Sequence, residues 1–427
     1  MMTRVVPNLA RDPLLPQRDL LLDTPWVTAR LSHLLANGQP ATIDDCTRLR
    51  ATYQVGRSLR VVHRVGIGGS SLIMAARAFR DGRSVKAFQL GTAVAVPCGQ
   101  APPLLHDAEL DTVFWTFPND RRLRTLAAVA DPSSELRALL PGWRISRLNA
   151  YAPEKSATFT CLDASGRILG YAKVGASIHV DLQMYEALGR ALPSSDPHLR
   201  LPGVIGSSEH HQTLILEPVP GRRLTDVRGN ATADDFARVG AALATLHGVR
   251  APAYTPVFAR FDESRLLNAG RLVGCVRPDV AGLADKLAHL LTVTRPVAPG
   301  EPVCLHGDIH PKNMILAGGR VAFIDFEDMA VGPAAADLGS LLAGLRYWRR
   351  VDSLSHSTHD AWVDAFLRGY AAVRPLPGRA SLSWHTAAAL FVERAGRAVT
   401  RVRRLSLEHL DDLLADARQI VTERASV

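Results

Sequence analysis

Hydrophobic and polar residues follow a mixed pattern in residues 1–140. Strand-like apolar runs cover 58–65 and 94–96, and helix-like patterns follow near 123–130 and 134–140. Runs rich in valine favour strands, whereas apolar residues that recur every three or four positions favour helices. We therefore expect a small α/β domain in this part of the chain.

The pattern changes to mainly strands over residues 141–221. Two strand-like runs within 147–161 surround a Pro-Glu-Lys-Ser turn, and a third run covers 167–174. The segment 181–188 indicates the start of a helix, and an apolar strand over 212–217 ends in a proline-rich turn. A small β-rich domain is the structure that this order of elements predicts.

Helical periodicity dominates the remainder, residues 222–427. Apolar residues recur at steps of three and four over 233–247, and similar patterns with interspersed aromatic residues cover 361–424. Taken together, the three blocks predict an α+β fold class. The expected domains are 1–140, 141–221 and 222–427.

Two short segments of the first and second blocks resemble each other. Tyr-Gln-Val-Gly-Arg-Ser at 53–58 and Tyr-Ala-Pro-Glu-Lys-Ser at 151–156 each open a predicted strand. One interpretation is a weak internal repeat, in which the first block echoes the β-rich one. Chance similarity over six residues is the alternative.

A predicted hairpin in the third block brings two polar residues together. The apolar runs Met-Ile-Leu and Val-Ala-Phe-Ile flank a Gly-Gly turn at 318–319, and Asn313 and Asp325 lie at the open ends. Closing this hairpin places the two side chains next to each other. An amide oxygen and a carboxylate are suitable ligands for Mg²⁺, which takes few protein ligands and leaves other positions to phosphate and water. We therefore expect Asn313 and Asp325 to bind Mg²⁺.

Asp308 lies five residues before Asn313 in a predicted tight loop. There it could accept the proton of an incoming hydroxyl group. A positioned base and metal ions that bridge phosphates are what phosphoryl transfer requires, with little covalent chemistry. The sequence thus predicts a kinase of some kind.

Lys173 is the candidate for holding nucleotide phosphates. Only five of the fifty basic residues are lysines, and Lys173 stands inside an apolar strand-like run. A compact ammonium rather than a planar guanidinium therefore has a specific use at this position. A lysine at a strand edge that extends to solvent is the alternative.

The motif His-Gly-Asp-x-His-x-x-Asn at 306–313, with Ile-Asp-Phe at 324–326, resembles the aminoglycoside phosphotransferase and choline kinase superfamily. These enzymes are relatives of protein kinases. The resemblance implies a bilobal protein-kinase-like fold that uses ATP and Mg²⁺. It makes 141–221 the small lobe, 222–427 the large lobe with the catalytic loop, and 1–140 an added cap-like domain. Some bacterial sugar kinases of this superfamily have such a domain.

The resemblance also implies roles for further residues. Asp308 is the catalytic base, and His310 is a catalytic residue that contacts the phosphate or the acceptor. His306 is a structural residue of the loop, and Asp337 is expected to cap or brace a helix. The expected nucleotide contacts are Lys173 with its helix partner Glu186, Lys155 and Ser156 over the phosphates, and backbone groups near Glu217 and Val219 at the adenine.

Composition excludes several other classes of protein. The chain of 427 residues is 47% hydrophobic, contains no apolar run long enough to span a membrane and begins without the apolar core of a signal peptide. Five scattered cysteines without a Cys-x-x-Cys argue against disulfides and structural zinc, and favour a reducing cytoplasm. The net charge of +9 is not concentrated in one tract, so no nucleic-acid partner is predicted.

The phosphate acceptor is expected to be a hydroxyl group of a small molecule. From residue 340 onward the sequence contains thirteen basic residues and nine acidic ones, which disfavours a polycationic acceptor. Sugars, cyclitols, aminoglycosides and natural products remain as acceptor classes, with neutral ones favoured. A protein kinase is one alternative, although a Gly-rich loop and Asp-Phe-Gly are missing. A catalytically silent nucleotide-binding scaffold is the other.

Overall fold

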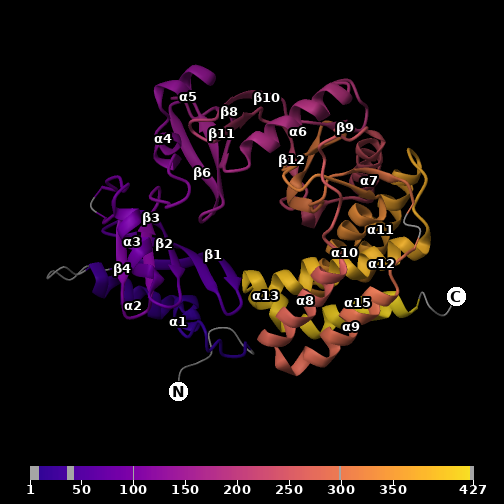
Figure 1. Ribbon diagram of the computed structural model, residues 1–427. Helices are drawn as coiled ribbons and strands as arrows, with labels where there is room; N and C mark the ends of the chain where they lie inside the picture. Colours follow the sequence, from indigo (N-terminus) through magenta and orange to yellow (C-terminus); the bar gives the residue numbers. More distant parts are fainter. Residues whose placement is uncertain (1–8, 36–42, 100, 298–299, 424–427) are drawn as a thin grey trace. The chain divides into compact units, whose positions relative to one another are not determined.

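The computed structural model describes residues 9–35, 43–99, 101–297 and 300–423, and it combines helices with mostly antiparallel sheets (Figure 1). The predicted α+β fold class is therefore confirmed. The chain divides into two compact units. A β-rich unit comprises 1–178, 205–216 and 399–404, and a helical unit comprises 179–204, 217–398 and 405–427. The domain boundaries at 140 and 221 remain predictions.

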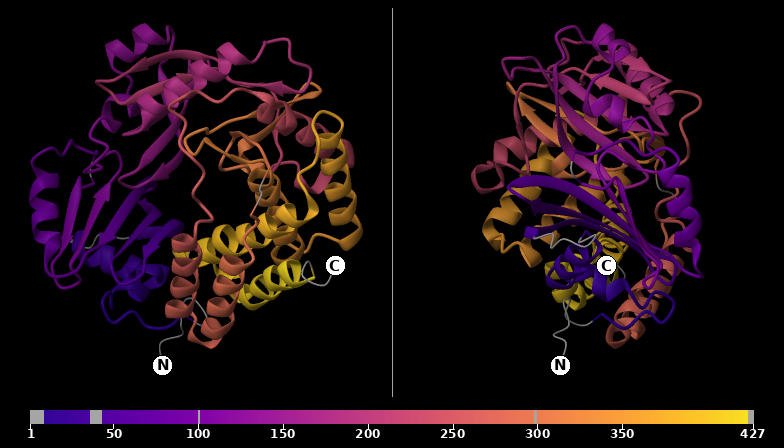
Figure 2. Two further views of the ribbon diagram at one scale, coloured as in Figure 1. Left: turned by 45° about the vertical axis from the view of Figure 1, so that its right-hand side comes forward. Right: turned by 90° about the vertical axis from the view of Figure 1, so that its left-hand side faces the viewer.

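Two five-stranded sheets form the β-rich unit, and both have the same strand order (Figures 1 and 2). Numbered along the chain within each sheet, that order is 1-2-3-5-4. The first sheet consists of β1 (Ile43–Gln54), β2 (Ser58–Ile67), β3 (Ser70–Ala78), β5 (Thr112–Thr116) and β4 (Leu104–Asp107). The second consists of β6 (Ile145–Ala152), β7 (Ser156–Leu162), β8 (Ile168–Gly175), β11 (Thr213–Leu216) and β10 (Val204–Ser208).

The helices repeat in the same order along the chain. Each sheet is preceded by two helices, and a further helix follows its third strand. The helices of the first set are α1 (Arg18–Leu22), α2 (Thr24–Leu35) and α3 (Arg83–Thr92). Those of the second set are α4 (Leu126–Ala130), α5 (Ser134–Leu139) and α6 (Ile178–Ala191). The internal repeat suggested by 53–58 and 151–156 is therefore confirmed in element order and strand order.

The first of the two similar segments forms the β1–β2 turn, and a carboxylate holds it. Asp12 Oδ2 accepts a hydrogen bond from the Tyr53 hydroxyl at 2.5 Å and another from the Gly56 N–H at 2.8 Å. Both donors belong to the hairpin, whereas the acceptor precedes α1. The carboxylate therefore fixes the turn to the segment in front of the sheet.

The β6–β7 turn is held in the same way. Asp120 Oδ2 accepts from the Tyr151 hydroxyl at 2.6 Å and from the Glu154 N–H at 2.7 Å. Asp120 also lies just before the helix pair of its own repeat. The six-residue similarity thus reflects equivalent hairpins with equivalent anchors, which explains why a tyrosine opens both segments.

One hydrophobic core serves both sheets of the β-rich unit. Val62 and Trp115 from the first sheet join Phe159 and Val174 from the second, and all four are at most 4% exposed. The indole of Trp115 also donates to the Tyr151 hydroxyl at 2.8 Å. The two sheets therefore share one packed core.

The strand expected at 94–96 is absent, and this prediction was wrong. The segment forms a turn after α3, in which the Val94 N–H donates to the Gly91 carbonyl at 3.1 Å. Val94 and Val96 are both exposed. In the described residues this segment pairs with no strand and its two valines stay exposed, so it lacks the cross-strand packing that stabilises a strand.

The helical unit combines a bundle of helices with two small sheets. Its helices are α6, introduced above, together with α7 (Ala233–Gly248), α8 (Glu263–Val276), α9 (Ala281–Val293), α10 (Ala335–Val351), α11 (His356–Ala371), α12 (Arg379–Ala389), α13 (Gly396–Arg401), α14 (Arg404–Glu408) and α15 (Leu410–Thr422), of which α6, α13 and α14 each have residues in both units. Its strands are β9 (Leu199–Arg200), β12 (Arg222–Arg223), β13 (Pro302–Leu305), β14 (Met314–Ala317), β15 (Arg320–Phe323) and β16 (Ala330–Pro333). The strands hold the loops of the candidate site, and the helices surround them.

Two glycines allow α7 and α11 to cross closely (Figure 1). A Cβ on Gly240 would lie 2.1 Å from the Phe366 carbonyl oxygen, and one on Gly369 would lie 1.9 Å from the Ala237 carbonyl oxygen. Any larger residue would force the helices apart. At the C-terminal end of α7, His247 Nδ1 lies 2.9 Å from the Tyr370 hydroxyl of α11.

Within the described residues, no helix is both long enough and apolar enough to cross a membrane. All five cysteines are free thiols, and Cys161 and Cys304 are buried. Burial raises the pKa of both of these thiols to about 12. They therefore serve as packing residues rather than as reactive groups.

Candidate active site

The predicted hairpin between Asn313 and Asp325 is confirmed. Strands β14 and β15 pair in antiparallel register, and Gly318 and Gly319 form the turn with φ angles of +56° and +89°. Positive φ at both positions suits glycine and matches the twist of the strands. The Ile324 N–H donates to the Asn313 carbonyl at 3.1 Å, so the polar residues follow directly on the last pair of the hairpin.

Asp325 lies two residues after the end of β15 and has a left-handed conformation. Its φ is +69°, which aspartate tolerates better than most residues, and its N–H donates to the Tyr185 hydroxyl at 3.1 Å. The ring of Tyr185 packs edge-on against Phe326 with 5.5 Å between centroids. Tyr185 therefore holds the backbone at Asp325, through the hydrogen bond to its N–H and through packing against the next residue. The side chain of Asp325 is half-buried.

Asn313 is buried and oriented by the loop before it. Its N–H donates to the His310 carbonyl at 2.8 Å, and its side-chain Nδ2 donates to the Asp308 carbonyl at 3.1 Å. This contact identifies the amide oxygen as the atom that is left to bind a ligand. The amide oxygen of Asn313 and the carboxylate of Asp325 are hard donors, so this pair fits Mg²⁺.

Asp337 holds the loop that carries the candidate base. This buried residue in the first turn of α10 accepts hydrogen bonds from the N–H groups of His306 at 2.7 Å and Gly307 at 3.1 Å. Its Oδ2 also lies 3.2 Å from His247 Nε2 at the end of α7. Burial would raise the pKa of Asp337, but the hydrogen bond with His247 and the nearby His306 hold it below its usual range.

Two predictions about this region can now be judged. Asp337 is a structural residue, as predicted, but it makes no capping hydrogen bond to the helix. Asp337 instead braces the loop that carries Asp308. The first turn of α10 places its carboxylate next to the two loop N–H groups, which donate hydrogen bonds to it. His306 is structural, as predicted: its ring is buried, its Nε2 lies 3.1 Å from the Ile324 carbonyl, and its Nδ1 accepts from the Asp308 N–H at 3.4 Å.

Gly307 has a φ of +78° and lies against the chain that follows the hairpin. A Cβ at this position would approach the Asp328 carbonyl oxygen to 1.8 Å. Both the backbone conformation and the available space therefore require glycine. The loop reaches Asp308 in this geometry only because residue 307 has no side chain.

Three cationic or polar groups surround the carboxylate of Asp308. Arg397 Nη2 donates to its Oδ1 at 3.0 Å, Arg260 Nη1 lies 3.5 Å from the same oxygen, and His310 Nε2 lies 3.4 Å from Oδ2. Burial would raise the pKa of Asp308, but His310 and the two guanidinium groups outweigh it and hold the pKa far below its usual range. The carboxylate is therefore ionised at any physiological pH.

The ring of His310 is fixed by its own loop. Nδ1 accepts from the Lys312 N–H at 3.2 Å, so the proton of a neutral ring belongs on Nε2. That nitrogen is the one that faces Asp308. His310 is thus placed to donate toward the carboxylate of Asp308, or toward a group bound next to it.

Arg260 connects the catalytic loop to the C-terminal helices. Its guanidinium lies 2.8 Å from Glu393 Oε1 and 3.0 Å from Asp328 Oδ2, in addition to its contact with Asp308. Glu393 lies in a π-helical segment, Leu390–Ala395, that precedes Arg397. A π turn changes the direction of the residues that follow, and such turns are frequent at functional sites.

Residues 176–385 match the sequence model of the Phosphotransferase enzyme family. This segment belongs to that family. It contains the whole catalytic loop, the hairpin and Asp337. Arg397 and Glu393 lie outside the matched residues, as do Lys155, Ser156 and Lys173.

Several solved structures resemble this chain at low sequence identity. Amicoumacin kinase hAmiN in complex with AMP-PNP, Ca²⁺ and Ami is 16% identical to this chain and has a TM-score of 0.46. The match covers 68% of this chain and 92% of hAmiN. Spectinomycin phosphotransferase APH(9)-Ia with ADP and spectinomycin is 12% identical, with a TM-score of 0.47 and coverage of 66% and 94%.

A choline/ethanolamine kinase family protein from Mesorhizobium loti is 14% identical, with a TM-score of 0.44 and coverage of 70% of this chain and 92% of that one. The curated proteins contain no match. At these identities and TM-scores the structural likenesses do not bear on the choice of substrate. The family assignment rests on the sequence match to residues 176–385.

Lys173, Lys155 and Ser156 lie together on the second sheet of the β-rich unit. Lys173 is half-buried in β8, where it pairs with Thr158 on one side and Leu214 on the other. Lys155 is exposed in the β6–β7 turn, and Ser156 is the first residue of β7. The strand and turn predicted for these residues are confirmed. Their contacts with phosphate remain predictions.

Glu186, the predicted partner of Lys173, lies on α6 of the family segment. Its carboxylate is exposed and lies 3.9 Å from the Arg190 guanidinium one turn later. Asp181 in the first turn of α6 is only 1% exposed. Sequence reasoning passed over Asp181, because an acidic residue in the first turn of a helix is common for electrostatic reasons alone.

Glu217 and Val219 follow β11 in the family segment, as predicted for the adenine-binding connection. The Glu217 N–H donates to the Gly203 carbonyl at 2.9 Å, and the Gly203 N–H donates back to Glu217 Oε2 at 3.2 Å. A Cβ on residue 203 would lie 2.6 Å from that carboxylate. Glu217 therefore closes this turn with its own side chain, and contact with adenine remains a prediction.

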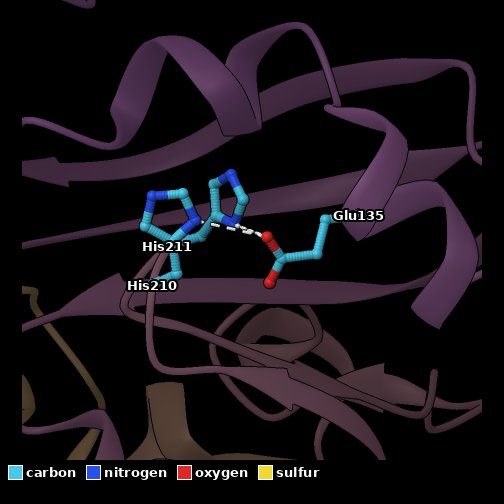
Figure 3. Close-up of side chains that lie close together, drawn as sticks. All are labelled: Glu135, His210 and His211. Carbon is cyan, nitrogen blue, oxygen red and sulfur yellow. Dashed lines mark hydrogen bonds and ion pairs between the residues drawn. The ribbon is translucent and has the colours of Figure 1, made fainter.

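A second polar cluster lies in the β-rich unit, at the edge of the second sheet. In Figure 3, His210 and His211 both point to one carboxylate oxygen of Glu135, Oε2, at 3.2 and 3.3 Å. Ser208 Oγ donates to the other oxygen at 2.6 Å. These hydrogen bonds lower the pKa of Glu135. The cluster fastens the turn after β10 to α5. Each of Glu135, His210 and His211 offers one atom that could bind a metal ion, and these atoms lie within 4.8 Å of one another.

Proposed function

We propose that this chain is an ATP- and Mg²⁺-dependent O-phosphotransferase that transfers the γ-phosphate to a hydroxyl group of a small molecule. The proposal is supported above all by the catalytic loop. The β14–β15 hairpin positions the amide of Asn313 and the carboxylate of Asp325. Asp337 holds the loop that carries the ionised Asp308. The match of residues 176–385 to a family of phosphotransferases agrees with it.

In this proposal Asp308 receives the acceptor. Its Oδ1 faces the two arginines, and Oδ2 faces His310 at 3.4 Å, so a carboxylate with about four acceptor sites has room for one hydroxyl. The hydroxyl oxygen attacks the γ-phosphorus while its proton passes to Asp308. The bond to the β-phosphate oxygen breaks, and ADP leaves with the electron pair.

The low pKa of Asp308 determines how it contributes. A strongly stabilised carboxylate is a weak base, so its first role is to orient the hydroxyl in line with the phosphorus. Proton transfer then comes late, when the hydroxyl has become acidic through bonding to phosphorus. Mg²⁺ held by Asn313 and Asp325 would neutralise charge on the phosphates.

The remaining roles concern the nucleotide. Lys173 and its helix partner Glu186 would hold the α- and β-phosphates, Lys155 and Ser156 would cover them, and the segment at Glu217 and Val219 would contact adenine. Lys173 is supported by its half-buried place in a strand. Asp181 is a second candidate partner on α6, because it is buried and Glu186 is exposed.

The acceptor in this proposal is neutral or anionic. Arg397 and Arg260 stand at the carboxylate that must receive the hydroxyl. A polycationic acceptor would have to approach these two guanidinium groups, which disfavours it by like-charge repulsion. Sugars, cyclitols and their acidic derivatives meet this condition better than aminoglycosides.

Two alternative functions make different predictions. A protein kinase would phosphorylate a protein or peptide substrate, and a silent scaffold would bind nucleotide without turnover. The full set of Lys173, Asp308, Asn313 and Asp325 favours an active enzyme over the scaffold. The absence of a Gly-rich loop and of Asp-Phe-Gly favours a small-molecule acceptor over a protein.

ADP release with Mg-ATP should be measured against sugars, sugar acids, cyclitols, aminoglycosides and amino alcohols. Asp308→Asn is the blank, because it keeps the shape of the side chain and removes the charge. Turnover should drop by about 10²–10⁴-fold, as expected for loss of a general base, with nucleotide affinity retained. Asp285→Asn, an exposed aspartate on α9, is the matched control and should not change turnover.

The outcomes separate the three functions. Acceptor-dependent turnover that is lost in Asp308→Asn supports the proposal and identifies the substrate class. Turnover only with protein substrates supports the protein kinase. Nucleotide binding without turnover on any acceptor supports the scaffold.

A further inference from the structure

The first sheet of the β-rich unit contains a cavity of about 440 Å³ that the proposed function does not use. Four arginines (57, 77, 80 and 83) line it, together with Phe79 and Asp81. Four positive charges and one negative charge give the lining a net charge of +3. A cavity of this size and charge is suited to a small anionic molecule.

Its place in the repeat is informative. In the first sheet, Arg77 pairs with Arg60 and Val113, and in the second sheet Lys173 pairs with Thr158 and Leu214. Arg60 and Thr158 are each the third residue of the strand that follows the anchored turn. Arg77 therefore occupies the register position that Lys173 has in the second sheet.

The turns correspond as well. Gly56 and Arg57 line the cavity from the β1–β2 turn, and their counterparts in the β6–β7 turn are Glu154 and Lys155. Gly56 and Glu154 are matched by their N–H groups, each of which donates to the aspartate that anchors its turn. The first sheet thus has an arginine at both positions where the second sheet has a candidate phosphate-binding lysine.

Part of this positive charge is neutralised within the unit. Arg77 forms an ion pair with Glu154, which Arg121 also contacts at 2.7 Å and Arg60 at 3.9 Å. One carboxylate is therefore shared by three arginines. Because Glu154 is buried, its ion pair shows that Arg77 can bind a negatively charged group away from solvent.

The outer arginines are less closely paired with acidic groups. Asp81 lies 3.9 Å from both Arg80 and Arg83, and Arg80 Nη1 also donates to the Gly56 carbonyl at 2.7 Å. The Arg57 side chain is exposed and has no partner among the described residues. A ligand can therefore engage Arg57 and Arg83 without breaking a close ion pair.

The amide groups at the start of α3 are not available. Asp111 accepts from the Gly82 N–H at 3.0 Å and from the Ser84 N–H at 2.8 Å. Recognition must come from guanidinium groups. Guanidinium groups bind both phosphates and carboxylates through two parallel hydrogen bonds. A terminal phosphate group presents three acceptor oxygens and a carboxylate only two, so a phosphate can engage more of the arginines at once.

We propose that this cavity is a second anion site, which binds a phosphorylated small molecule through its phosphate groups. The N-terminal repeat has kept the phosphate-facing positions of the small lobe and changed them to arginine. The comparison with Lys173 depends on the proposed function. The cavity, its arginines and their binding test do not.

Isothermal titration of the full chain with inorganic pyrophosphate, without Mg²⁺, tests the site. Arg57→Gln and Arg83→Gln, made singly, should each weaken binding at least about tenfold, because each removes a charged hydrogen-bonding group. Arg64→Gln is the matched control, since Arg64 is an exposed arginine of the same hairpin outside the cavity. It should leave the affinity unchanged, and higher salt should weaken binding to the unmodified chain.

Pyrophosphate could also bind at the proposed nucleotide site, so Lys173→Ala is titrated in parallel. Binding that persists in Lys173→Ala and is lost in Arg57→Gln supports the second site. Binding that is lost in Lys173→Ala, or that both arginine variants retain, overturns it. Neither result depends on turnover, so a failure here leaves the proposed function to its own test.

Discussion

Arg397 on α13 donates a hydrogen bond to Asp308 on the catalytic loop, with 3.0 Å between Nη2 and Oδ1. The two residues are far apart in sequence, and only Asp308 belongs to a recognisable motif. Their contact means that the candidate base begins the reaction as half of an ion pair. The side chain of Arg397 is 34% exposed, so this guanidinium can respond to what binds beside it.

Replacing Arg397 with methionine should raise the pKa of Asp308, because one of the charges that stabilise its carboxylate is removed. In the unmodified chain Asp308 stays ionised well below the usual value of about 4, so kcat/KM shows no acidic limb from this group. In Arg397→Met that limb should move to higher pH. The pH profile of kcat/KM checks this, with Arg368→Met, an exposed arginine on α11, as control. Identical profiles for Arg397→Met and the unmodified chain would contradict the assignment.

Removal of the proposed metal ligand should change the response to Mg²⁺. Asp325→Ala should need far more Mg²⁺ for half-maximal turnover and reach a lower maximum, because one of two protein ligands is lost. Glu327→Gln removes a nearby acid that the geometry does not assign to the metal, so its Mg²⁺ dependence should be normal. The measurement is initial rate against Mg²⁺ concentration. Equal dependence in both variants would remove Asp325 from the site.

A side chain at position 307 should damage the loop through a direct clash. In Gly307→Ala the new Cβ meets the Asp328 carbonyl oxygen at 1.8 Å and the φ of +78° is strained, so a loss of more than about 2 kcal/mol in unfolding free energy is expected. Gly318→Ala has similar strain, with φ of +56°, but nothing within 4 Å of its Cβ. It should cost only about 1 kcal/mol. Urea unfolding of both variants separates the clash from the strain, and equal losses would show that the clash does not occur.

The sequence predicted the elements that depend on local pattern. The hairpin at 314–323 follows from two apolar runs and a Gly-Gly turn, and α7 follows from its apolar period. The prediction of a strand at 94–96 was wrong, because a strand needs a partner strand and a short apolar run does not reveal whether a partner is available. The order of the strands in the two sheets was out of reach, since strand pairing is set by contacts between distant segments.

The candidate site shows the same division. Asp308, Asn313 and Asp325 lie within one short stretch, so spacing and turn chemistry were enough to group them. Arg260 and Arg397 reach Asp308 only through the folding of distant helices, and nothing near them in sequence marks the contact. The π-helical segment at 390–395 also has no sequence period of its own that would predict where Arg397 lies.

The brace at Asp337 gives a prediction with a pH dependence. Asp337→Asn turns an amide toward the N–H groups of His306 and Gly307, so about 1–3 kcal/mol of unfolding free energy should be lost at pH 7, along with turnover. Because folding lowers the pKa of Asp337, the ionised carboxylate stabilises the fold above about pH 4, and this contribution disappears as the pH falls below that value. The difference between the variant and the unmodified chain should therefore shrink in acid. Urea unfolding from pH 7 to pH 3 measures it, with Asp285→Asn as control. A difference that stays constant or grows in acid would mean that the charge of Asp337 does not hold the loop.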